Sequence, residues 1–201
     1  MARRSPRSSL GKGPDEAREQ LMRAAERCID RHGIRKTTMD DIAREAGISR
    51  PSVYRYFQDR EDLLIALMAE HSRALNERAH RFIEQQPTFE DALVEGLLYV
   101  ADHGRRDPFT RHLVKMDDSE LTDVLDSTGS AADFAREFWG GYLDAAVQRG
   151  EMSAELDTRE VYRWLAEVGL MLMRLMERDQ NTADEYRSMI RTFVLPAFRS
   201  G

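Results

Sequence analysis

Residues 37–64, TTMDDIAREAGISRPSVYRYFQDREDLL, contain the pattern that decides the fold. A helix-turn-helix needs a small residue where its two helices cross, a residue that tolerates positive φ in the tight turn four positions later, and a branched apolar anchor from the second helix. Ala43, Gly47 and Val53 fill these three roles in order. The outward face of the second helix is then free to enter a DNA major groove.

The ends of the two helices also carry local signals. Thr38 and Asp41 have the spacing of a capping box, with Asp in place of the usual Glu or Gln, and predict that a helix begins after Thr38. After the turn, Ser49 can cap a third helix and Pro51 suits its first turn. We expect this short helix to run through Phe57.

Helical patterns extend in both directions from this motif. A first helix is predicted over 14–31, with an apolar stripe that ends before Gly33. Downstream, capping residues and apolar spacing predict helices over 59–86, 88–103, 108–116, 120–125, 130–149, 158–178 and 182–198. The expected fold is all-α: a three-helix N-terminal helix-turn-helix domain followed by a larger helical domain, about nine or ten helices in total.

Charge is unevenly distributed along the chain. Residues 1–60 hold 14 Lys and Arg against 9 Asp and Glu, whereas the remainder holds 16 against 27. A basic head on an acidic body suits a polyanionic partner for the head alone. The expected organisation is a flexible basic arm over 1–13, a helix-turn-helix DNA-binding domain over 14–60, and a helical domain over 61–201.

The sequence argues against several classes of protein. No apolar run approaches the roughly 20 residues of a membrane span, and the single cysteine, Cys28, cannot form an internal disulfide. We therefore expect a cytoplasmic protein. We find no activated-nucleophile motif, glycine-rich phosphate loop or zinc-ligand spacing, so neither an enzyme nor a metal or cofactor site is expected.

The third predicted helix exposes side chains suited to DNA. Arg50 can donate two hydrogen bonds to guanine, and Tyr54 can offer its ring to a thymine methyl or its hydroxyl to a phosphate. Ser52, Arg55 and Tyr56 share the same two turns. The alternative is that the tyrosines pack beneath the helix and the arginines are solvated. The arm residues Arg3, Arg4, Arg7 and Lys12 either reach a minor groove or form a frayed tail.

On these residues, the segment 37–64 resembles the TetR family of one-component bacterial transcription regulators, and the resemblance covers roughly residues 15–70. It implies phosphate contacts from Thr37 and Thr38, and a phosphate-binding role for Arg60, which stands where the family usually has Lys. It further implies that the operator is read by Arg50, Pro51, Ser52 and Tyr54, and that the DNA backbone is held by Arg55 and Tyr56.

Beyond residue 70 the resemblance concerns overall plan. It implies a ligand-binding and dimerisation domain, a homodimer through residues 158–198, and a near-palindromic operator that is released when a largely apolar small molecule binds. Large side chains in the region of the family's pocket are candidate ligand contacts: Phe109, His112, Trp139, Tyr142, Trp164 and Met171. His103 and Arg111 could add polar contacts. The alternative is that the apolar side chains among them are plain core, which is the more common role of methionine and aromatic residues at helical spacing.

A competing hypothesis is a ligand- or partner-binding helical module without specific DNA recognition. The Arg50-to-Tyr56 face argues against it. Repression is expected over activation because it is the usual mode of the family that the sequence resembles.

Overall fold

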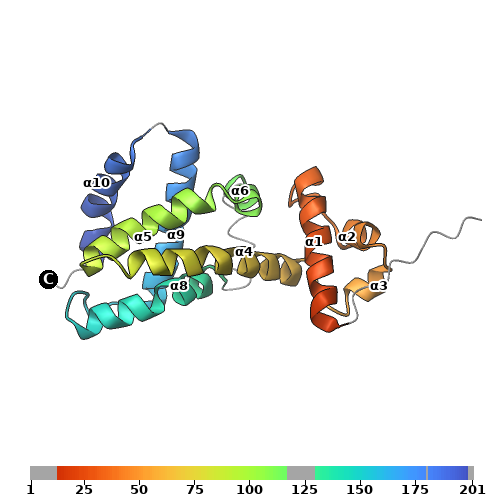
Figure 1. The fold of residues 1–201 in the computed structure, drawn as a ribbon, viewed down its shortest axis with the longest axis horizontal. Helices are drawn as coiled ribbons and strands as arrows, with labels where there is room; N and C mark the ends of the chain where they lie inside the picture. Colours follow the sequence, from red (N-terminus) through yellow and green to blue (C-terminus); the bar gives the residue numbers. More distant parts are fainter. Residues whose placement is uncertain (1–12, 117–129, 180, 199–201) are drawn as a thin grey trace, which may run out of the picture. The chain divides into compact units, whose positions relative to one another are not determined.

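The computed structural model describes residues 13–116, 130–179 and 181–198. Throughout these ranges the regular structure is helical, as the sequence predicts (Figure 1). The chain forms two compact units, Met1–Glu70 and His71–Gly201. The division falls inside the long helix α4, Arg60–Ile83. The predicted arm and the predicted helix near 120–125 lie outside the described residues.

The N-terminal unit contains α1 (Pro14–His32), α2 (Met39–Ala46), α3 (Arg50–Val53) and the first part of α4. α1 packs against α2, and α2 against α3. Thr38 begins α2 with a capping box, because its hydroxyl accepts from the Asp41 amide while the Asp41 carboxylate accepts from the Thr38 amide. The apolar faces meet in one interior, whose buried side chains include Leu21, Ala25, Ile29, Ile42, Val53 and Phe57.

The C-terminal unit continues from α4 through α5 (Phe89–Gly104), α6 (Pro108–Val114), α8 (Ser130–Gln148), α9 (Thr158–Arg178), α10 (Ala183–Phe193) and the short 3-10 helix η1 (Leu195–Phe198). α9 packs against α5, α6 and α8, and α10 packs against α5 and η1 (Figure 1). Their buried faces form one core that includes Leu97, Trp139, Leu165, Leu172, Ile190 and Phe198. α9 therefore joins most of this unit together.

Several helices end earlier than the sequence predicts, and three of them, α3, α4 and α10, lose the most residues. α3 ends at Val53, because the chain turns there: the amides of Tyr56 and Phe57 both donate to the Val53 carbonyl, and this turn carries Phe57 into the interior. α4 ends at Ile83 rather than near residue 86. α10 ends at Phe193, and a 3-10 turn that contains Pro196 replaces its last turn, since proline lacks the amide that an α-helix needs.

Candidate nucleic-acid interface

The turn between α2 and α3 has the geometry that the sequence predicts. Ala43 is buried where the helices meet, and Val53 is fully buried beneath α3. Gly47 adopts φ 70°, ψ 26°, a left-handed conformation that disfavours side chains, and its amide donates to the Ala43 and Arg44 carbonyls. The Ile48 amide also donates to the Ala43 carbonyl. α3 is therefore held from below and its opposite face is left in solvent.

Arg50 and Tyr54 form the centre of this exposed face. Arg50 Nη2 donates to the Tyr54 hydroxyl at 3.2 Å, and its guanidinium carbon lies 5.5 Å from the centre of the Tyr54 ring. Arg50 Nη1 also donates to Asp40 Oδ2 at 3.0 Å. The Tyr54 side chain is 41% exposed. The sequence interpretation missed Asp40, whose link to Arg50 spans ten positions and joins α2 to α3.

The neighbouring candidates have separate partners. Pro51 is exposed and Ser52 is half-buried. The Ser52 hydroxyl lies 2.8 Å from the Ser49 hydroxyl. Ser49 occupies the N-cap position of α3, but its side chain makes no capping hydrogen bond, so its predicted capping role is wrong. Arg55 Nη2 donates to the Tyr56 hydroxyl at 3.1 Å, forming a second arginine–tyrosine pair beside the first.

Two of the predicted phosphate contacts point inward in this structure. Thr37 is only 3% exposed, and its hydroxyl donates to the Gly33 carbonyl at 2.9 Å. Arg60 Nε donates to the Thr37 carbonyl at 2.9 Å, and its Nη2 donates to the Ile34 carbonyl. Thr37 therefore shapes the turn before α2, and Arg60 fastens that turn to the start of α4. Thr38 is exposed but serves as the cap described above.

Arg18 is a supporting residue that the sequence interpretation did not single out. From α1, its Nη1 donates to the Tyr56 carbonyl. Its guanidinium carbon lies 4.2 Å from the centre of the buried Phe57 ring. Because the two contacts hold the chain just after α3, Arg18 helps to position the exposed face. Its link to Tyr56 spans 38 positions, so local spacing carries no signal for it.

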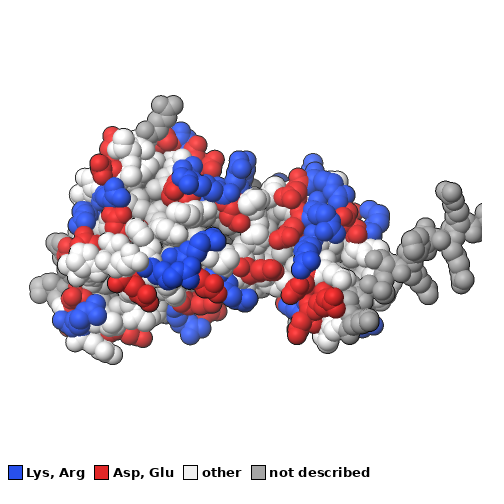
Figure 2. Space-filling model, in the orientation of Figure 1, with Lys and Arg blue, Asp and Glu red and all other residues white. Residues whose placement is uncertain are grey.

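Charges on the N-terminal unit are interspersed rather than uniformly basic. Glu45 accepts hydrogen bonds from Arg27 Nε, at 2.6 Å, and from Arg31 Nη2. These two guanidinium groups hold the pKa of the Glu45 carboxyl below its ordinary value. Figure 2 shows acidic and basic side chains alternating on the visible surface. Several basic side chains thus tie α1 to α2 instead of standing free.

The residues predicted to contact a ligand divide into two groups. Phe109 is buried and stacks on His71 with ring centres 5.0 Å apart, and Trp139 is buried edge-on against Phe138. The Tyr142 hydroxyl donates to the His80 carbonyl at 3.3 Å. His112 is half-buried on α6.

Trp164 and Met171 differ from this first group. They lie on α9 with 47% and 42% of their surfaces exposed. Their predicted role as ligand contacts stays a prediction. The two residues are seven positions apart, two turns of a helix, which places them on one outer stripe of α9.

The described residues hold no group of three or more His, Cys, Asp or Glu side chains arranged to bind a metal ion. Among the described helices, none is long and apolar enough to cross a membrane.

Comparison with known proteins agrees with this description of the N-terminal unit. Residues 21–67 match the family model of bacterial regulatory proteins of the tetR family. An uncharacterized HTH-type transcriptional regulator of Mycobacterium bovis is 33% identical over 88 residues, which is 44% of each chain. The matched segment thus spans less than half of that relative.

Longer matches exist at lower identity. The HTH-type transcriptional repressor BepR of Brucella suis is 26% identical over 168 residues, covering 80% of this chain and 77% of the relative. The structure of the fatty acid degradation regulator FadR from Bacillus halodurans superposes with a TM-score of 0.59 at 20% identity. That match covers 92% of this chain and 96% of the other, and it shows that the fold is shared. The Mycobacterium bovis and Brucella suis relatives are regulators of transcription.

Proposed function

We propose that the chain is a transcriptional repressor, on the premise that residues 21–67 match the family model of bacterial regulatory proteins of the tetR family. It binds a near-palindromic operator as a homodimer and is released by a small molecule that binds in its C-terminal unit. Residues 14–60 serve as the DNA-binding domain and 61–201 as the ligand-binding and dimerisation domain. Such a repressor acts in the cytoplasm, where its operator lies.

The observation that carries this proposal is the exposed Arg50–Tyr54 pair on α3, a helix whose other face is anchored by the buried Val53. An arginine at the start of a recognition helix can donate two hydrogen bonds to guanine O6 and N7, and the tyrosine beside it can contact a thymine methyl or a phosphate. Ser52 and Arg55 supply further donors on the same short segment. Arg60 and the Thr37 side chain act indirectly in this proposal, because their polar groups hold the turn before α2.

Exposed apolar residues support the proposed homodimer. Phe193, at the end of α10, is 75% exposed, and Trp164 and Met171 on α9 are nearly half exposed. Large apolar side chains of this kind lose more by facing water than small ones do, and a twofold interface would cover them. All three lie within residues 158–198.

Selection of bound sequences from a random duplex pool tests DNA recognition. We expect the purified chain to enrich a near-palindrome. Arg50→Ala and Tyr54→Ala should each weaken operator binding by roughly 5- to 150-fold and flatten base preference at their own positions, as loss of a base contact does. Arg81→Ala, which removes the same charge from an exposed position on α4, is the matched control. Wild-type affinity and selectivity in both variants would show that the reading face is wrongly assigned.

Sedimentation equilibrium tests the dimer. We expect the wild-type chain to be dimeric at micromolar concentration and Phe193→Asp to shift it toward monomer, because a buried carboxylate without a partner is costly. Ala154→Asp, at an exposed position outside α9 and α10, should leave the assembly unchanged. Dimers of equal stability in both variants would exclude this surface as the interface.

A further inference from the structure

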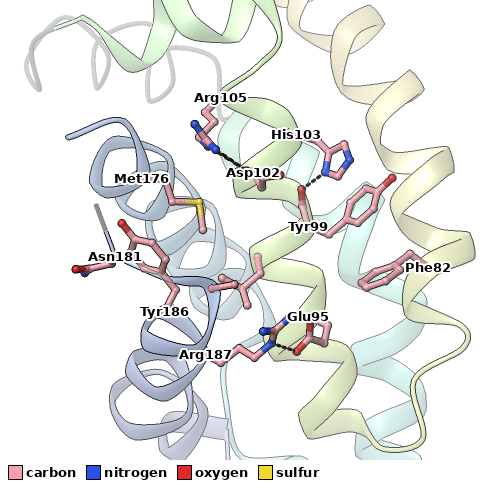
Figure 3. A pocket seen from close by; sticks show the side chains of 12 residues that line it. Phe82, Glu95, Tyr99, Asp102, His103, Arg105, Met176, Asn181, Tyr186 and Arg187 are labelled. Carbon is pink, nitrogen blue, oxygen red and sulfur yellow. Dashed lines mark hydrogen bonds and ion pairs between the residues drawn. The ribbon is translucent and has the colours of Figure 1, made fainter. Parts of the chain in front are cut away.

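A pocket of about 350 Å³ lies beside α5 in the C-terminal unit. α5 contributes its floor, and the end of α9, the α9–α10 connection and α10 form one wall (Figure 3). Phe82, from the end of α4, lines the opposite side. The volume falls within the range typical of small-molecule sites. None of the six residues that the sequence singled out as ligand contacts lines this pocket, although His103 does.

The charged side chains of the pocket neutralise one another. Arg187 on α10 donates to Glu95 on α5 through two parallel bonds of 2.6 and 3.0 Å. Arg105 donates to Asp102 at 2.7 Å, one turn apart on α5. Figure 3 shows both pairs at the border of the pocket. Because each charge already has a partner, an ionic ligand would have to break one of these pairs to be compensated.

Two hydrogen-bonding groups of the pocket remain uncommitted. Tyr186 is 3% exposed, and its buried hydroxyl has no hydrogen-bond partner among the described residues. Burial raises the pKa of this phenol, with a smaller effect from Asp179, so the group stays neutral at physiological pH. A buried hydroxyl without a partner is rare in folded proteins, because its desolvation is not repaid. Because the hydroxyl itself is covered, a ligand supplies the missing bond once side chains of the lining, such as the flexible Met176, have moved aside.

His103 provides the second group. Its Nδ1 lies 2.9 Å from the Tyr99 carbonyl, which can only accept, so Nδ1 must carry a proton. In the neutral ring Nε2 is then an acceptor. The ring stacks on Tyr99 with centres 4.0 Å apart, and Tyr99 in turn stacks on Phe82 at 4.9 Å. This run of flat surfaces suits contact with another flat ring.

We propose that this pocket binds a neutral, planar aromatic molecule that carries hydroxyl groups. One hydroxyl satisfies Tyr186, a second donates to His103 Nε2, and the ring contacts the aromatic side. This inference deepens the proposed function. It rests on that function only where it names the molecule as the effector that changes DNA affinity. Binding itself does not depend on DNA recognition.

Isothermal titration calorimetry of the full chain with a naphthalenediol tests the site, since this probe is neutral, flat and carries two hydroxyl groups. Tyr186→Phe removes only the unpartnered hydroxyl and should leave folding intact while weakening binding roughly three- to tenfold. Tyr162→Phe, at a buried tyrosine outside the pocket, is the matched control. Ala183→Trp, at an exposed position on the pocket border, should block binding, and Ala154→Trp should not.

Two related probes test the chemical class. The corresponding dimethoxynaphthalene lacks donors, and a naphthalene disulfonate carries charge; each should bind at least about tenfold more weakly than the diol. Tighter binding of the disulfonate, absence of diol binding at millimolar concentration, or equal affinity in wild type, Tyr186→Phe and Ala183→Trp would each overturn the proposal. Failure to enrich an operator would instead count against the repressor function, because calorimetry on the free chain requires no DNA.

Discussion

Replacing Gly96 with alanine tests how tightly the core of the C-terminal unit is packed. Gly96 lies on α5, and a Cβ atom there would be 2.6 Å from Cη2 of Trp139 and 3.0 Å from Cγ2 of Ile83. Both neighbours are buried, with exposed fractions of 4% and 1%. The indole cannot withdraw from the new methyl group without disturbing its own contacts, which include the edge-on contact with Phe138.

The magnitude follows from two opposing effects. Alanine is favoured over glycine inside a helix by about 0.5–1 kcal/mol. Forcing an extra methyl group into a well-packed core costs roughly 1–3 kcal/mol. We therefore expect Gly96→Ala to lower the free energy of unfolding by about 1–2 kcal/mol. Gly104→Ala should cost less, because the atom at 2.6 Å is the terminal methyl of Met173, the far end of a flexible side chain.

Urea unfolding followed by tryptophan fluorescence measures this effect, since Trp139 and Trp164 both belong to the C-terminal unit. Gly141→Ala is the control. Gly141 lies on α8 with no atom within 4 Å of the added methyl group, so this substitution should raise the free energy of unfolding by about 0.5–1 kcal/mol. If Gly96→Ala raises the free energy of unfolding as much as Gly141→Ala does, the argument that the Trp139 indole is immobile is refuted.

Three further predictions concern the N-terminal unit. Asp40→Asn should strengthen DNA binding by up to about fivefold at low salt, because the Asp40 carboxylate competes with DNA for the exposed Arg50 guanidinium. Fluorescence anisotropy measures the affinity. Unchanged affinity would show that Asp40 does not restrain Arg50. Thr38→Ala should lower the free energy of unfolding of this unit by about 0.5–2 kcal/mol, because the α2 cap is lost. Amide hydrogen exchange measures this change. Exchange at the wild-type rate would argue that the capping box contributes nothing to stability.

The third of these predictions concerns pH. Hydrogen bonds from Thr38, mainly from its hydroxyl and to a smaller extent from its amide, hold the pKa of Asp41 below its ordinary value of 3.8. The stability that this carboxylate contributes is therefore complete above that value. It is lost as the pH falls through the lower pKa of the folded state. The stability difference between wild type and Thr38→Ala should therefore shrink below about pH 4. A difference that grows in acid would contradict the assignment.

Much of the fold could be predicted because its signals are local. The capping box joins residues three positions apart, Gly47 acts at its own position, and Pro51 favours the first turn of α3 through its own ring. These interactions form within one helical turn, so their partners are visible in the sequence itself. The helix-turn-helix and the all-helical fold followed from them, and the error in the length of α3 arose where the burial of Phe57 overrides the local pattern.

The roles of individual side chains required the tertiary structure. Apolar spacing could not separate Trp139, which is buried, from Trp164, which faces solvent, because α8 and α9 carry apolar residues on more than one side. Arg60 and Arg18 resemble other surface arginines in the sequence, yet each hydrogen-bonds to backbone carbonyls more than twenty positions away.

The proposed effector pocket depends still more on distant contacts. Glu95 and Arg187 meet across 92 positions of the chain, and the Tyr186 hydroxyl can be recognised as unpartnered only once its surroundings are known. The sequence thus determined which segments form helices and which short segment is the candidate for reading DNA. Which polar groups remain available for a ligand was decided by the tertiary structure, because hydrogen bonds between distant segments exist only after the helices have packed.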